Sequence, residues 1–226
     1  MSNYMTKRDA NRGDCSQPCR WKYHLYEKNR EGQFFPVEEN DNGTFLYNSR
    51  DLCMINHVDD LVKAGITSFK IEGRAKSAYY TAVITNAYRK ALDDYIKNGK
   101  PENYKAPQWI TDEVNKISHR EYSTGFFYGG EPGQTHNSGG YIREYDVVAV
   151  CEDYKEDKAF ITQRNRFFQG DELDVLPPSG IPFIVNVIQM FDERGNEVEK
   201  APHAMQKLVM IADKEIPKGS VLRKRR

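Results

Sequence analysis

The sequence predicts two regions of different architecture: an α/β region of the parallel-sheet or barrel type, and a small all-β barrel after it. Residues 44–98 alternate between helical and strand-like patterns, as expected of a parallel α/β fold. A glycine-rich stretch, 125–140, follows. From Tyr145 onward the chain consists of short strand-like runs separated by turns, and closure into a barrel would remove their exposed edges.

The α/β region is built from two predicted helices and one predicted strand. The first helix begins at Ser49 or Asp51 and ends at Gly65. Residues 66–71 form a short apolar run typical of a buried strand, which Gly73 breaks. Ser77 is placed to cap the second helix, which Asn98-Gly99 ends. Its apolar positions recur at spacings of three and four and share one face: Tyr80, Ile84, Ala87, Tyr88, Ala91 and Tyr95.

The predicted domains are residues 1–108 for the α/β part, 109–140 for a connector with a short helix near 111–117, and 141–226 for the β-barrel. Residues 192–196 (DERGN) indicate a tight hairpin within the barrel. The predicted strands are 145–151, 159–163, 172–176, 183–191, 207–211 and 220–222.

The composition is that of a folded protein, with 38% hydrophobic and 29% charged residues. No apolar run approaches the roughly 18 residues that cross a bilayer, and no signal peptide is recognisable, so we expect a soluble cytoplasmic protein without membrane contact. The formal net charge is zero. Basic residues nevertheless gather in residues 1–30 and in 223–226, and each group is either a phosphate-attracting patch or a solvated, frayed segment.

Cysteines supply the first candidate site. Cys15 and Cys19 are flanked by basic residues, which would favour their thiolate forms and metal binding, although an isolated pair of this spacing is more often structural or incidental. Cys53 falls near the start of the first predicted helix, where a thiolate would also be stabilised. An iron–sulfur cluster normally requires four thiolates, and Cys151, in the β region, is a poor fourth.

Charged residues after the predicted strand supply the second candidate site. Glu72, Arg74 and Lys76 would lie at the carboxyl end of a barrel strand, where barrel active sites are built. Glu72 is the candidate catalytic residue, as a base or an orienting group, and Arg74 with Lys76 would bind a carboxylate or phosphate. The alternative is an ordinary loop of solvated charges.

The segment 118–128 (SHREYSTGFFY) is the third candidate. His119 and Arg120 with the aromatic residues behind them can hold RNA by stacking and phosphate contacts. We favour the alternative, in which the loop packs with its rings, Phe126, Phe127 and Tyr128, docked onto the barrel.

Four long blocks of the sequence resemble successive blocks of the collagenase-like peptidase family U32: SNYMTKRDANRGDCSQPCRWKY, FLYNSRDLCMI, AGITSFKIEGRAKSAYY and SHREYSTGFFYG. The resemblance covers residues 2 to 130, and the β-rich remainder is similar to the small C-terminal barrel of family members. It implies the C-terminal part of a TIM-like α/β barrel followed by a β-barrel domain. It also implies a 4Fe-4S cluster, with Cys15 and Cys53 as ligands and Cys19 as a less conserved third position.

The same resemblance implies an RNA-modifying activity, hydroxylation of a tRNA uridine at the wobble position, with tRNA as partner and prephenate as co-substrate. The peptidase activity of the family name and a non-catalytic RNA-binding remnant are the alternatives. Family members carry a long N-terminal stretch before the first of these blocks, so we expect a missing segment or a separate chain to complete the barrel and the cluster's ligand set.

Overall fold

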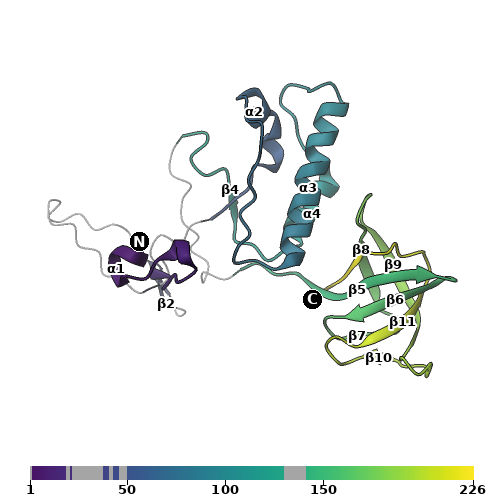
Figure 1. Cartoon of the computed structure of the whole chain (residues 1–226). Helices are drawn as coiled ribbons and strands as arrows, with labels where there is room; N and C mark the ends of the chain where they lie inside the picture. The colour runs from purple at the N-terminus through teal and green to yellow at the C-terminus, as the bar shows by residue number, and fades with distance from the viewer. Residues whose placement is uncertain (1, 19–20, 22–37, 41–42, 46–49, 130–140) are drawn as a thin grey trace, which may run out of the picture. The chain divides into compact units, whose positions relative to one another are not determined.

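A computed structural model of the protein describes residues 2–18, 21, 38–40, 43–45, 50–129 and 141–226. Contacts divide the chain into two compact units (Figure 1). The first unit combines residues 1–54 with 119–142, and the second combines residues 55–118 with 143–226.

The first unit consists of short elements. It contains the helix α1 (Ser2–Thr6), the 3-10 turn η1 (Ala10–Arg12) and the antiparallel pair β1 (Glu38–Asn40) and β2 (Gly43–Phe45). Strands β3 (Asp51–Leu52) and β4 (Tyr122–Ser123) pair in parallel, although they lie far apart in the sequence. This short ladder joins the two chain segments of the unit.

The second unit begins with a helical part. It contains η3 (Ile55–His57), α2 (Val58–Lys63), α3 (Ala78–Lys97) and α4 (Gln108–Asn115). The Ser77 side chain accepts a hydrogen bond from the Tyr80 backbone N–H and so caps α3, while Gly99, with φ of 77°, follows its C-cap Asn98. The buried face of α3 is the apolar stripe of its sequence: Val83, Ile84, Ala87, Ala91 and Tyr95.

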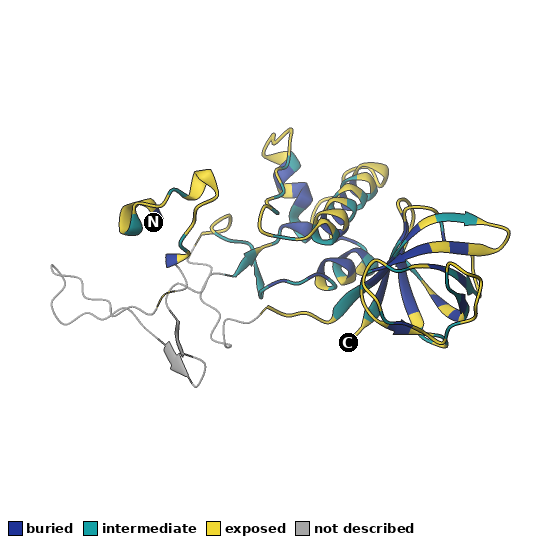
Figure 2. Ribbon diagram, turned by 60° about the horizontal axis from the view of Figure 1, so that its bottom comes forward, coloured by how far each residue is buried: buried dark blue, intermediate teal, exposed yellow. Residues whose placement is uncertain are grey.

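The remainder of the second unit is a closed antiparallel barrel with strand order β11-β6-β5-β12-β8-β9, in which β9 pairs back with β11 (Figure 1). Alternate side chains fill its interior, and Figure 2 shows buried and exposed segments alternating along the strands. A two-stranded ribbon, β7 (Phe167–Phe168) with β10 (Lys200–Ala201), lies beside it. The barrel strands are β5 (Tyr145–Lys155), β6 (Lys158–Gln163), β8 (Glu172–Leu176), β9 (Phe183–Phe191), β11 (Lys207–Ala212) and β12 (Val221–Arg225).

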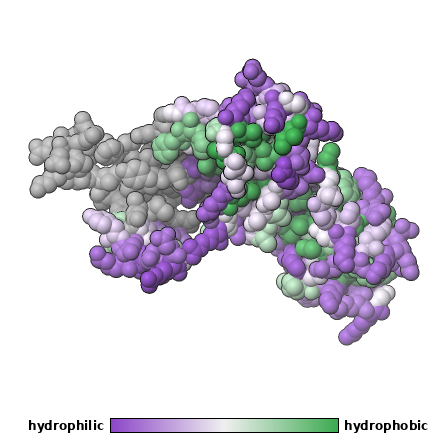
Figure 3. Space-filling model, turned by 45° about the horizontal axis from the view of Figure 1, so that its top comes forward, coloured by the Kyte–Doolittle hydropathy of each residue, from purple (hydrophilic) through white to green (hydrophobic). Residues whose placement is uncertain are grey.

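The barrel confirms the β part of the predicted fold, strand by strand. The turn after Phe191 is also confirmed, because the Asp192 carboxylate accepts the backbone N–H groups of Arg194 and Asn196. Within residues 143–226 two strands were missed, β7 and β10, whose two residues each are too few to show a periodic pattern. Figure 3 shows hydrophilic residues over most of the visible barrel surface, as expected for strands with one buried face.

The α/β part of the prediction is not confirmed. Asp51 and Leu52 form the strand β3 and do not begin a helix, because the Asp51 carboxylate accepts the Arg120 backbone N–H and its own N–H donates to Glu121. Residues 66–71 belong to no strand in the structure, and Ile66 is exposed. A buried parallel strand requires a neighbour to satisfy its backbone groups, and the described residues place none beside this run.

The prediction for the basic tail at 223–226 is wrong for Arg223, which lies in β12 between β5 and β8 and is fully buried. Arg225 and Arg226 are exposed. Within the described part of the chain, no helix is long and apolar enough to cross a membrane.

The N-cap of α3 gives a direct test of local structure. Ser77→Ala removes the acceptor of the Tyr80 N–H, and we expect it to lower the free energy of unfolding by about 1 kcal/mol. For a protein of this size that is a fall in Tm of about 3 °C, measurable by circular dichroism. Ser77→Asp keeps a capping oxygen and should stay within about 1 °C of the parent protein. Equal losses in both variants would show that the cap does not contribute.

Candidate functional site

Cys15 lies in a turn that hydroxyl groups organise. The Ser16 hydroxyl shares hydrogen bonds with α1, with its Oγ 3.0 Å from Ser2 Oγ and 2.9 Å from Thr6 Oγ1, and the Ser16 backbone N–H donates to Ser2 Oγ. On the other side of Cys15, Asp14 pairs with Arg8, which holds the pKa of the Asp14 carboxyl below its usual value. Cys15 is therefore exposed on an ordered turn.

Cys53 lies in the same unit, directly after β3. Its backbone N–H donates to the Ser123 carbonyl at 2.9 Å, so it continues the parallel pairing with β4. The expectation that a helix N-terminus stabilises its thiolate is therefore wrong, since the 3-10 turn η3 begins only at Ile55. The Cys53 side chain remains half-buried.

The described cysteines do not complete a ligand set for a 4Fe-4S cluster. Cys19 falls outside the described residues. Cys151 is buried in the barrel, donates to the carbonyls of Asp153 and Ile216, and has its pKa raised to about 11 by burial, which makes it a packed structural thiol. Within the described ranges, no three His, Cys, Asp or Glu side chains come close enough together to hold a metal ion.

Glu72, Arg74 and Lys76 share one loop in the second unit, ahead of α3. The Glu72 carboxylate accepts the Arg74 backbone N–H at 2.9 Å and lies 3.7 Å from Lys70 Nζ. The hydrogen bond from Arg74 is the main reason that the pKa of Glu72 is lowered. A carboxylate so stabilised is suited to orienting a group more than to removing a proton.

Lys76 contacts the helical part of the second unit. Its ammonium donates to the Ser118 carbonyl at 3.3 Å and lies 5.3 Å from the centre of the Tyr80 ring. Arg74 is exposed. The loop therefore presents one exposed guanidinium, with a second cation held against the helical part of the unit.

The segment 118–128 divides into a buried and an exposed half. His119 is only 4% exposed, stacks on Tyr122 with ring centres 4.3 Å apart, and contacts the Arg120 carbonyl through Nδ1. His119 is therefore a packed residue. Within the first unit, a turn from Thr124 to Gly129 leaves Phe126 74% exposed, with Phe127 and Tyr128 more than half exposed, and the docking of these rings onto the barrel stays a prediction.

A buried ionic cluster that sequence reasoning missed joins the helices of the second unit to its barrel. Arg223 of β12 is fully buried, and its guanidinium donates to Glu113 of α4 at 2.8 and 3.1 Å and to Asp174 of β8 at 2.7 Å. Lys116 bridges the same two carboxylates at 2.7 and 2.6 Å. Tyr79 of α3 completes the cluster through its hydroxyl, 3.3 Å from Arg223.

Two cations face two anions in this cluster, so its formal charge is zero. Burial would lower the pKa of Lys116, but the hydrogen bonds to Asp174 and Glu113 outweigh it and leave that pKa raised. The pKa of Arg223 is likewise raised against burial, mainly by Glu113. The sequence signal for this cluster was an arginine that directly follows an apolar residue, Leu222, in a strand. Because side chains alternate along a strand, Arg223 points away from the barrel interior, where Leu222 is buried, and toward the helices.

The fold places the chain among proteins that combine a helical segment with a small C-terminal antiparallel barrel. The chain belongs to peptidase family U32: residues 1–137 match that family, and residues 143–223 match the peptidase family U32 C-terminal domain.

Similar curated proteins carry names from RNA modification. The chain is 35% identical to tRNA hydroxylation protein P1 of Bacillus subtilis (strain 168), over 99% of this chain and 53% of the relative. It is 31% identical to tRNA hydroxylation protein P of Escherichia coli (strain K12), over 80% of this chain and 48% of the relative. A 23S rRNA 5-hydroxycytidine synthase of the same strain is 34% identical over 78% of this chain and 26% of the relative. The chain thus spans about half the length, or less, of these relatives.

The buried cluster predicts a large effect of a single substitution. Arg223→Ala leaves Glu113 and Asp174 facing Lys116 alone, and we expect the free energy of unfolding to fall by about 3 kcal/mol or more. The matched control is Arg225→Ala, whose side chain is 73% exposed and lies 3.7 Å from Glu144. It should cost under about 0.5 kcal/mol in urea titrations. Similar losses in both variants would contradict the role of the cluster.

The buried phenol of Tyr79 leads us to expect a loss of protein stability at alkaline pH. Burial raises the pKa of Tyr79 from 10.0 to about 12. The phenol's contribution to stability is therefore complete below pH 10, where the unfolded tyrosine is also protonated, and is lost as pH rises toward 12. We expect Tyr79→Phe to lose less stability between pH 9 and 11.5 than the parent protein, by on the order of 1 kcal/mol.

Urea titrations at both pH values test this. Tyr4→Phe, at a tyrosine that is 88% exposed, is the control and should follow the parent curve. If Tyr79→Phe also follows the parent curve, the phenol does not govern the alkaline loss.

Proposed function

We propose that the chain is part of a U32-family enzyme that hydroxylates RNA, with tRNA as the substrate and the wobble uridine as the modified base. The observation that carries the proposal is the 35% identity with a tRNA hydroxylation protein over 99% of this chain. The rRNA 5-hydroxycytidine synthase supports the same class of reaction on a second kind of RNA.

The exposed loop before α3 is the proposed substrate-facing element. Arg74 would bind an anionic group, either an RNA phosphate or a carboxylate of a co-substrate such as prephenate, because a guanidinium offers paired donors to both. Glu72 would accept the Arg74 backbone N–H, fix the shape of the loop, and so orient Arg74 toward the bound anion. Lys76 would add positive charge from its position against Tyr80.

Cys15 and Cys53 are the proposed cluster ligands, with Cys19 as a third. Both described thiols belong to the first unit and are accessible, unlike Cys151. The described residues alone do not supply four ligands, so we assign no catalytic step to the cluster.

A chimera tests the function, because the chain matches 53% of its Bacillus subtilis relative. The matching part of that relative is replaced by this chain, and the chimera is expressed in cells that lack the relative. We expect 5-hydroxyuridine-type modification to reappear in tRNA, as measured by mass spectrometry of nucleosides.

Arg74→Ala in the chimera should lower that modification about tenfold or more, the effect of losing a charged hydrogen bond to substrate. The control is Arg89→Ala, an exposed arginine that pairs with Asp93 on α3 and should leave the modification unchanged. A folded chimera that cleaves gelatin and leaves tRNA unmodified would support the peptidase alternative instead.

A further inference from the structure

The ribbon β7–β10 presents a distinct face at the side of the barrel. Phe167 and Ala201 are fully buried and anchor the ribbon on the barrel core. Phe168 and Lys200 are directly opposite each other in the register, one residue further along each strand, and both are exposed. Arg166 is two residues before Phe168 and is also exposed, so the three side chains share the outward face of the ribbon.

Cations on this face differ from the cations of β12 in their pairing. Arg223, Lys224 and Arg225 each form an ion pair with a carboxylate. Arg166 and Lys200 form none within the described part of the chain. Their positive charge is therefore available to a ligand.

The charged groups around the ribbon balance one another, because Lys224 and Arg164 are matched by Asp171 and Glu199. Lys224 lies 5.8 Å from the centre of the Phe168 ring and pairs with Asp171, the carboxylate that also accepts the Phe168 N–H. Arg164, next in the chain to Gln163 at the end of β6, donates to the Met205 sulfur and pairs with no carboxylate among the residues described. Glu199, beside Lys200, is the remaining carboxylate of the ribbon.

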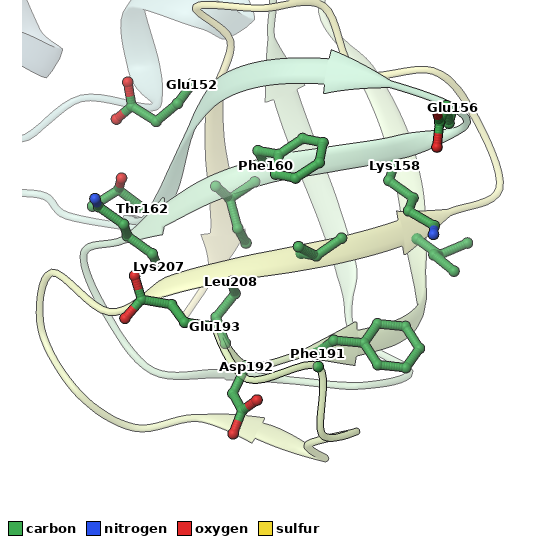
Figure 4. A pocket seen from close by; sticks show the side chains of 14 residues that line it. Glu152, Glu156, Lys158, Phe160, Thr162, Phe191, Asp192, Glu193, Lys207 and Leu208 are labelled. Atoms are coloured by element: carbon green, nitrogen blue, oxygen red, sulfur yellow. The ribbon is translucent and has the colours of Figure 1, made fainter.

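The barrel's groove has the opposite character. A hollow of about 1050 Å³ lies across β6 and β11, with Phe160 over its centre and carboxylates around it (Figure 4). The carboxylates of Glu152, Glu156, Asp192 and Glu193 outnumber the ammonium groups of Lys158 and Lys207 in its lining. A polyanion is repelled by such a lining, so the groove and the ribbon select different partners.

We propose that the outward face of the β7–β10 ribbon is a docking surface for RNA. Arg166 and Lys200 contact backbone phosphates, and the Phe168 ring between them stacks on an unpaired base. The inference rests on the proposed function for its choice of polyanion. An exposed aromatic ring flanked by unpaired cations fits RNA better than an acidic peptide, because a peptide carboxylate uses the cations and leaves the ring without a partner.

The test is tRNA binding by the full 226-residue chain, with an unmodified tRNA transcript as the probe. Arg166→Glu combined with Lys200→Glu should weaken binding about tenfold, and the plot of log affinity against log salt should become shallower by about two units. Phe168→Ala should weaken binding about fivefold with the salt slope unchanged, because stacking releases no counterions.

The matched control reverses two other exposed cations of the barrel, Lys158 and Arg194, which form no ion pair in the described structure either. This double variant has the same net charge as the ribbon variant and should keep its affinity within about twofold, because distant surface charges are screened. Circular dichroism melts of all variants establish that each is folded.

Equal weakening in the ribbon and control variants, or a chain that binds no tRNA at low salt, overturns the proposal. So does competition by poly-glutamate at the same charge concentration as the tRNA, since it would show an acidic-peptide surface. If a chimera that carries Arg166→Glu and Lys200→Glu still hydroxylates tRNA, the proposed function stands and the ribbon has no part in it. If the chimera does not hydroxylate tRNA but tRNA binding still depends on the ribbon, the docking surface stands and the proposed function fails.

Discussion

The pairing of Arg223 with Glu113 and Asp174 is the interaction on which the second unit depends. A fully buried guanidinium is stable only where carboxylates compensate its charge, and those two come from different elements, α4 and β8. Lys116 balances the second negative charge. Because charge balance requires all four groups at once, α4 is fixed against the barrel wall in one position, and α3 follows through Tyr79.

The same need for charge balance determines which cations of the barrel are paired with carboxylates and which are not. The cations at 223–226 each pair with an internal or neighbouring carboxylate, which compensates much of the positive charge that the sequence shows there. Arg166 and Lys200 at the ribbon carry positive charge that no carboxylate of the described residues pairs with, although neither is distinctive in the sequence. Counting charges along a chain therefore misplaces a binding surface when the cations form part of the packing.

The sequence predicted local structure well where short-range signals decide it. The cap at Ser77, the apolar stripe of α3 and the alternation of the barrel strands are all readable from spacing, and all were found. It failed where long-range contacts decide. Asp51 has a residue pattern fit for a helix start, but Arg120 and Glu121, far along the chain, hold it extended. For the candidate site, spacing identified Glu72, Arg74 and Lys76 as one group, and the structure does place them on one loop. No spacing rule connects Arg223 to Glu113, because the two meet only after the barrel and the helices have packed.

The position of β12 in the barrel has a consequence for how the protein is made. β12 follows the other barrel strands in the sequence and lies between β5, the first of them, and β8, so the barrel wall stays open until β12 has left the ribosome. Until then β5 and β8 present unpaired edges, and Glu113, Asp174 and Lys116 lack their central cation. The barrel can therefore close only after β12 has been made, and a chain that lacks β12 would be prone to aggregation.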